Sequence, residues 1–212
     1  MRYYRLSRLL ILSLVSLMIL NCSIFKRKEQ NADYLISQGW DYFEDGHYLD
    51  ALDQFEEAIS VEKNNQECYH GRAWCYLMLS DVSEAIIDFE KAVQLGKETL
   101  DPHAGLAAAY LAQENYSSAI EKANYVLAGN SNYYFEHYPL INYQDMHLIL
   151  AMAYFHEGDL SSAQEHVDFL FPENQLNPDQ PSTWNFQQVS YNSYAEALMA
   201  VIDYLDGLYG ML

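Results

Sequence analysis

Four histidines recur at intervals of about ten residues in the second half of the sequence: His137, His147, His156 and His166. Imidazole is the commonest metal ligand and a frequent general base, so such a series could build a metal or hydrolytic site. His156-Glu157 begins like the zinc-protease motif, but no second histidine stands four residues after His156. The sequence also shows no glycine-rich phosphate loop and no nucleophile elbow. We therefore expect structural histidines, no catalytic residue, no metal and no cofactor; a metal-binding or hydrolytic protein is the less favoured alternative.

Two of the three cysteines, Cys68 and Cys75, lie seven residues apart. On a helix this is about two turns, or ~10 Å, which exceeds the reach of a disulfide. A metal pair would need two more ligands at zinc-finger spacing, which we do not find. We interpret both as small, buried apolar residues.

The third cysteine, Cys22, ends an apolar run. Residues 2–8 include three arginines and precede Leu9–Leu20, "LLILSLVSLMIL". These twelve residues are too few to span a bilayer comfortably. A basic start followed by a short apolar stretch is typical of a secretory signal peptide, which we assign to residues 1–21.

The end of this run, Ile19-Leu20-Asn21-Cys22, resembles the lipobox of bacterial lipoproteins, with Asn21 where Gly or Ala is usual. The resemblance implies a lipid on Cys22, and Ser23 after it favours the outer membrane, with the chain facing the periplasm. An uncleaved membrane anchor or an ordinary cut is the alternative. An anchor would still place the rest of the chain outside the cytoplasm.

The formal charge of −19 excludes one class of partner. Ala123 to Leu212 contains no Lys or Arg. Because nucleic-acid binding needs a basic surface, we expect no nucleic-acid partner.

One pattern occurs four times between residues 32 and 171. A tyrosine precedes an alanine by nine residues at Tyr42 and Ala51, Tyr76 and Ala85, Tyr110 and Ala119, and Tyr154 and Ala163. Successive alanines are separated by 34, 34 and 44 residues. Each unit also contains two segments with apolar residues at three- and four-residue steps, which predict two helices.

This pattern resembles the tetratricopeptide repeat, a helix-turn-helix unit of 34 residues. The resemblance implies an all-α, right-handed α-solenoid of about four repeats with a C-terminal capping helix. The expected segments are the tether 22–31, the repeat domain 32–171 (repeats near 32–65, 66–99, 100–133 and 144–177), the connection 172–183 and the capping helix 184–212.

In this family the first helices line a concave groove, and the family register assigns that lining to particular residues. The partner-binding residues implied here are Ile36, Trp40, Phe43, His70, Trp74, Leu77, Met78, Ala108, Leu111, Leu148, Met152 and Phe155. A clamp for a terminal carboxylate needs Lys, Arg and Asn, but its positions hold Ile36, His70 and Ala104. The apolar, aromatic groove suits an amphipathic helix or an extended apolar segment, or else it is covered by the chain itself.

The ten extra residues between repeats three and four fall in Ala128–Gln144, "AGNSNYYFEHYPLINYQ". This insertion predicts either a binding loop on one face or a longer second helix with a packed turn. A further amphipathic segment follows Ser193, whose spacing to Glu196 indicates a capping box. We expect it to cover the last repeat, and self-association through this helix is possible.

Together these features predict a lipid-anchored scaffold or adaptor of the bacterial cell envelope that binds an envelope protein in its groove. A periplasmic holdase chaperone, which would use the same groove for many unfolded chains, is the alternative.

Overall fold

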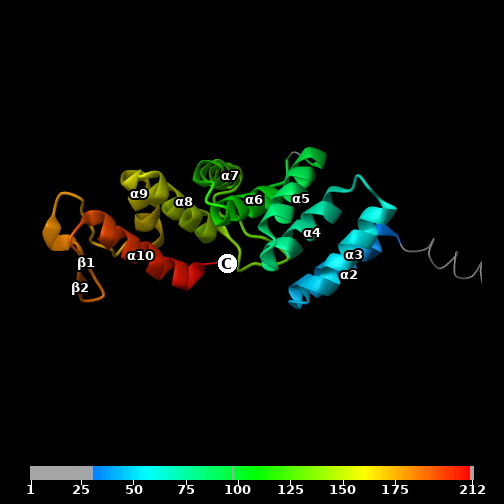
Figure 1. Ribbon diagram of the computed structural model, residues 1–212, viewed down its shortest axis with the longest axis horizontal. Coiled ribbons are helices and arrows are strands. Elements are labelled where there is room, and N and C mark those ends of the chain that lie inside the picture. The colour runs from blue at the N-terminus through cyan, green and yellow to red at the C-terminus, as the bar shows by residue number, and fades with distance from the viewer. Residues whose placement is uncertain (1–30, 97, 211–212) are drawn as a thin grey trace, which may run out of the picture.

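The computed structural model describes residues 31–96 and 98–210, so the predicted signal peptide, Cys22 and most of the tether lie outside the described residues. The described residues form an all-α solenoid, as the sequence predicts (Figure 1). Its helices are α2 (Ala32–Glu44), α3 (Tyr48–Val61), α4 (Gln66–Met78), α5 (Val82–Leu95), α6 (Asp101–Ala112), α7 (Tyr116–Gly129), α8 (Tyr143–Glu157), α9 (Leu160–Leu170) and α10 (Tyr194–Tyr209).

The helices pack in four successive pairs, from α2 with α3 to α8 with α9. The first helices of the pairs, α2, α4, α6 and α8, also contact one another in order and form one layer of the solenoid. The last helix, α10, packs against α8 and α9 and runs back along the row toward its middle (Figure 1). None of the helices within residues 31–96 and 98–210 has both the length and the hydropathy needed to cross a bilayer.

The two helices of each pair are joined by a turn of recurring geometry. Each turn contains one residue with positive φ, at Gly46 (78°), Ser80 (65°), Glu114 (60°) and Gly158 (84°). The next residue donates its backbone N–H to the carbonyl of the repeat tyrosine five positions earlier, at 2.8–2.9 Å. This bond satisfies a carbonyl that the end of the helix would leave without a partner. The tyrosine spacing in the sequence therefore marks where each first helix ends.

A phenylalanine from α3 fills the space between the first two repeats. Phe55 is fully buried, and its ring lies against two glycines, Gly39 in α2 and Gly71 in α4. A Cβ atom added at Gly39 would lie 2.7 Å from the ring, and one at Gly71 would lie 2.2 Å from it. Because neither glycine carries a side chain, α2 and α4 both approach the Phe55 ring of α3 closely.

The same arrangement recurs at the second junction, where a Cβ at Gly105 would lie 2.1 Å from the ring of Phe89. At the third junction the corresponding positions hold Ala123 and Ile149, both buried in the same core. At this junction the large side chain, Ile149, belongs to α8, the first helix of its pair, and the small one, Ala123, belongs to α7, the second helix of the preceding pair. Exchanging large for small across the junction keeps the total volume similar, which a packed core tolerates.

The C-terminal segment differs from the predicted helix 184–212. A 3₁₀ turn (Pro181–Thr183) is followed by a two-stranded hairpin of β1 (Asn185–Phe186) and β2 (Val189–Ser190), and α10 begins only at Tyr194. Ser193 accepts the backbone N–H of Glu196 at 3.2 Å, as a capping box requires. The Glu196 carboxylate accepts the N–H of Asn192 at 3.0 Å, one residue before the usual partner.

We predict that Gly71→Ala destabilises the protein by about 1–3 kcal/mol, because the new methyl group must displace the Phe55 ring. Equilibrium unfolding in urea measures this change. Gly207→Ala in α10 is the matched control, since no heavy atom lies within 4 Å of its added Cβ. We expect the control to be neutral or to gain about 0.5 kcal/mol in helix propensity. Equal unfolding midpoints for the two variants would contradict this packing.

Candidate functional site

The insertion between repeats three and four is a packed loop and not a longer helix. Helix α7 has 14 residues, as α3 and α5 have, and residues 130–142 follow it without helical structure. We call this segment the insert. Tyr143 donates its N–H to the carbonyl of Tyr133 at 2.7 Å, and Phe135 donates to Ile141 at 2.8 Å. The insert is thereby closed into a compact loop, so the predicted longer second helix is wrong. The loop lies on one face of the solenoid, and its binding of a partner stays a prediction.

The insert occupies the concave side of the first two repeats. Phe135 is fully buried, and its ring stacks on Trp74 with the centroids 4.8 Å apart and an angle of 18° between the planes. The ring also meets Trp40 edge to face at 5.7 Å and His70 at 5.5 Å. Aromatic contacts of this kind add to the stability gained by burying the rings. Phe135 therefore fills the space in which the sequence places a partner's side chain.

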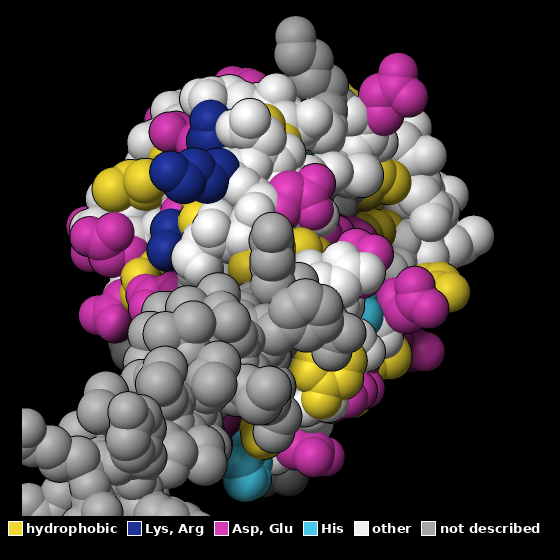
Figure 2. Space-filling model, turned by 90° about the vertical axis from the view of Figure 1, so that its right-hand side faces the viewer, with side chains coloured by type: hydrophobic (Ala, Val, Ile, Leu, Met, Phe, Trp, Pro, Cys, Tyr) yellow, Lys and Arg dark blue, Asp and Glu magenta, His cyan; other side chains and the backbone are white. Residues whose placement is uncertain are grey.

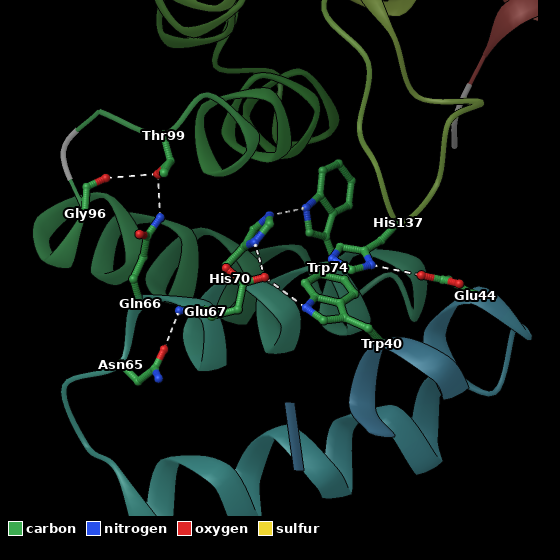
Figure 3. A network of polar contacts seen from close by, with 10 residues as sticks. All are labelled: Trp40, Glu44, Asn65, Gln66, Glu67, His70, Trp74, Gly96, Thr99 and His137. Carbon is green, nitrogen blue, oxygen red and sulfur yellow. Dashed lines mark hydrogen bonds and ion pairs between the residues drawn. The ribbon is translucent and has the colours of Figure 1, made fainter. Parts of the chain in front are cut away.

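A second side chain of the insert closes the outer end of this site. The ring of His137 stacks on Trp40 at 3.9 Å, with the planes 2° apart. Its Nδ1 atom lies 2.9 Å from a carboxylate oxygen of Glu44, at the end of α2 (Figure 3). The insert is thus joined to the first repeat by an apolar contact, a stacked pair and a polar contact.

Beneath the insert, polar side chains connect the two tryptophans (Figure 3). The indole N–H of Trp40 donates to Glu67 at 2.9 Å, and the indole N–H of Trp74 donates to Nε2 of His70, also at 2.9 Å. Because an indole nitrogen can only donate, Nε2 of His70 is the acceptor and the Nδ1 atom carries the proton. Nδ1 faces Glu67 at 3.5 Å. Burial alone would raise the pKa of Glu67, but the contacts with His70 and Trp40 lower it overall.

The structure covers most of the residues predicted to line the partner-binding groove. Eight are buried: Ile36, Trp40, Phe43, His70, Trp74, Leu77, Ala108 and Leu148. Met78, Leu111, Met152 and Phe155 are half-buried. The insert covers Trp40, Phe43, His70 and Trp74, while Leu148, Met152 and Phe155 share a core cluster with α10. Partner contact at the four insert-covered residues stays a prediction that requires the insert to move.

One part of the concave side stays open. A cleft of about 230 Å³ lies between α6, α8 and the end of α10, and we call it the concave cleft. Its lining is Ala108, Leu111, Ala112, Asp145, Leu148, Ile149, Met152, Asp206 and Gly210. A second hollow, of about 320 Å³, separates the insert from the end of α10 and shares Asp145 and Gly210 with the cleft. The walls of the concave cleft are mainly apolar, and they include two carboxylates, Asp145 of α8 and Asp206 of α10.

Asp145 lies in the first turn of α8 and is only 1% exposed. One oxygen accepts the N–H of Asn142 at 2.7 Å, which completes a capping box. The other oxygen, Oδ1, has no hydrogen-bond partner within the described part of the chain. Burial raises the pKa of Asp145 to about 6, although bonds from the backbone of Asn142 and Asp145 oppose the shift. Nothing in the sequence indicated that this aspartate is buried.

The histidines and cysteines singled out in the sequence are spread over separate environments. His156 stacks on Tyr116, and His147 contacts His166 through their Nδ1 atoms at 2.9 Å. Within residues 31–96 and 98–210, no three metal-ligating side chains come together. Cys68 and Cys75 are buried free thiols, and burial raises the pKa of each to about 12.

Acidic side chains are spread over the N-terminal end of the solenoid, where Lys and Arg gather at one edge (Figure 2). The four described cations are Lys63, Arg72, Lys91 and Lys122. Arg72 makes two bonds to Asp88 on α5, at 2.6 and 2.9 Å, and Lys122 pairs with its neighbour Glu121. All four precede Ala123, and the residues that line the concave cleft include two carboxylates and no Lys or Arg.

Residues 36–102, which span α2 to the start of α6, match the tetratricopeptide repeat family. No match was found among curated proteins. The chain is also similar to several solved structures, all of low sequence identity.

YrrB, a tetratricopeptide-repeat protein described as having an unusual peptide-binding site, has a TM-score of 0.61 at 16% identity, over 88% of this chain and 92% of YrrB. MamA has a TM-score of 0.59 at 16% identity, over 78% of this chain and 83% of MamA. A tetratricopeptide-repeat protein from Parabacteroides merdae has a TM-score of 0.57 at 17% identity, over 89% of this chain and 64% of that protein. These likenesses define the fold as a tetratricopeptide-repeat solenoid.

We predict that Phe135→Ala destabilises the protein by about 3 kcal/mol, because it removes a fully buried ring from the aromatic site. Tryptophan fluorescence should shift to the red as water reaches Trp74, and urea unfolding gives the free-energy change. Tyr134→Ala is the matched control, since its side chain is 61% exposed. Unchanged stability and emission in Phe135→Ala would contradict the burial of the insert.

We predict that Asp145→Asn stabilises the protein at neutral pH by about 1–3 kcal/mol. The raised pKa means that the folded protein binds this proton more tightly than the unfolded chain does. The wild-type carboxyl thus contributes fully below its ordinary pKa of 3.8, and the contribution is lost as pH rises through about 6. Unfolding measured at pH 4 and pH 7.5 should show the gain only at the higher pH. Asp33→Asn, an exposed first-turn position of α2, should show no comparable gain.

Proposed function

We propose that this protein is an interaction scaffold of a bacterial cell envelope, and that it binds a segment of a partner protein in the concave cleft. The observation that carries this proposal is the division of the concave side. The insert fills the half formed by α2 and α4, whereas Leu111, Leu148 and Met152 border an open apolar cleft in the half formed by α6 and α8. Apolar surface left open at a groove is typical of an interaction site.

The size of the cleft suits a few side chains of a protein segment. Together with the neighbouring hollow, it follows the concave side from α6 past Asp145 to the exposed side chains of Leu140 and Leu208. A partner that entered it would contact four separate parts of the chain, namely α6, α8, the insert and α10. The peptide-binding site described for YrrB supports a peptide segment as the partner for a solenoid of this shape.

We further propose that a lipid on Cys22 holds the solenoid at the outer membrane, facing the periplasm. The support is the lipobox-like sequence Ile19-Leu20-Asn21-Cys22 after a short apolar run. Tethering to a surface raises the effective concentration for any partner on the same membrane, so a modest cleft can serve an adaptor. A holdase has less support, because the aromatic surface that would receive unfolded chains is covered by the insert.

Photo-crosslinking in the native cells tests this function. A photoreactive residue replaces Leu111 in the cleft, Trp74 beneath the insert, or Ile87, which is 58% exposed on α5 and serves as the control. We expect Leu111 to capture one recurrent envelope protein, Trp74 to capture the chain's own insert, and Ile87 to capture neither. The same cells expressing Cys22→Ala should lose the recurrent capture together with acyl labelling of the chain.

The outcomes separate the alternatives. Capture of many unrelated chains from Leu111 would favour the holdase. Equal capture from Leu111 and Ile87 would show that the cleft is not a partner site. Membrane association of Cys22→Ala equal to that of the wild type, together with no acyl label on the wild-type chain, would contradict the lipid anchor. These results would leave the cleft proposal standing.

A further inference from the structure

The concave cleft contains a charge that the fold does not need. As the third residue of α8, Asp145 uses one oxygen to accept the N–H of the capping residue Asn142 at 2.7 Å. An asparagine side chain could make the same bond, because its amide oxygen is also an acceptor. The second oxygen, buried and without a hydrogen-bond partner in the described chain, is not explained by the cap. A buried carboxylate oxygen in this state costs free energy, and such costs are concentrated at functional sites.

No Lys or Arg among residues 31–96 and 98–210 pairs with this carboxylate. The sequence from Ala123 to Leu212 contains no Lys or Arg, and the ion pairs formed by residues 31–96 and 98–210 do not include Asp145. The physical cause of its raised pKa is burial, with no contribution from a positive neighbour. The described residues thus leave the charge of Asp145 without a positive partner, and a cation of a bound segment would supply one.

A second carboxylate borders the same cleft from another helix. Asp206, in the last turn and a half of α10, lines the cleft with Asp145. Burial and the nearby Asp203 raise the pKa of Asp206, so its surroundings also disfavour a bare negative charge. The other side chains that line the cleft are apolar and belong to α6 and α8.

We propose that the concave cleft recognises a partner segment in which a lysine or arginine is flanked by apolar residues. The cation lies between Asp145 and Asp206, and the apolar neighbours pack on Leu111, Leu148 and Met152. This inference rests on the proposed function and specifies the chemistry of its partner. Because the unpaired carboxylate is costly in the free protein, pairing it on binding rewards a basic segment over a neutral one. Both carboxylates also repel acidic segments, which excludes wrong partners.

Peptide display tests the inference without knowledge of the partner. The purified full chain is used to select binders from a library of random 12-residue peptides, and the most frequent sequence is synthesised. We expect selected sequences to be enriched in Lys or Arg beside apolar residues. The synthetic peptide should bind the wild-type protein at least tenfold more tightly than Asp145→Asn. A matched peptide with norleucine in place of the basic residue should bind both proteins alike.

Three variants serve as controls. Asp206→Asn should weaken binding severalfold, whereas Asp203→Asn, exposed on the same helix and outside the cleft lining, should not. Ala112→Trp fills the cleft from an exposed position and should abolish binding while leaving the core intact. Circular dichroism and thermal unfolding of each variant exclude a loss of fold as the cause.

The outcomes distinguish this inference from the proposed function. Peptides that Ala112→Trp blocks, but that lack basic residues or bind Asp145→Asn equally well, would overturn the recognition of a cation and retain the cleft as a partner site. Binders insensitive to Ala112→Trp, or no selected binders, would overturn both.

Discussion

The stacking of Phe135 on Trp74 decides how the concave side of this solenoid is used. Repeats one and two supply two tryptophans, a phenylalanine and a histidine to one surface, and such a surface would be unstable if it were left bare in water. The insert removes it from water with a ring of the chain's own. The surface that stays accessible on the concave side is then determined by the insert together with α10, which packs on Leu148, Met152 and Phe155.

The insert also helps to form the part of the concave side that it does not cover. Held by Phe135 and His137, its returning half brings Leu140 and Ile141 to the hollow opposite the end of α10. The insert ends at Asn142, whose side chain caps α8 and thereby fixes where that helix starts. The aromatic contact in the first repeats therefore helps to position the first turn of α8, on which the open cleft depends.

Much of this fold was predictable because its signals are local. The tyrosine and alanine spacing gave the repeat register, since each tyrosine carbonyl ends a helix and each alanine packs where two helices approach. That register also identified Leu111, Leu148 and Met152 as concave, and they do line the cleft.

The insert was not predictable in this way. Phe135 contacts residues more than sixty positions earlier, and periodicity carries no information about such non-local pairing. Ala123, which stands where the first two junctions have a phenylalanine, could not be explained from local sequence either. The side chain that compensates for its small volume, Ile149, belongs to a different helix.

The charge of Asp145 shows how an acidic group is tolerated in an apolar place that lacks internal cations. The first turn of a helix presents free backbone N–H groups and a partial positive charge, so a carboxylate there is supported even when it is shielded from water. This support is incomplete, because it satisfies one oxygen and leaves the other without a partner in the described residues. A neutral residue would make a more stable protein, and a fully exposed aspartate would give a weaker field within the cleft. Asp145 lies between these two cases, because the start of α8 holds the charge while the apolar residues beside it keep the carboxylate buried at the lining of the cleft.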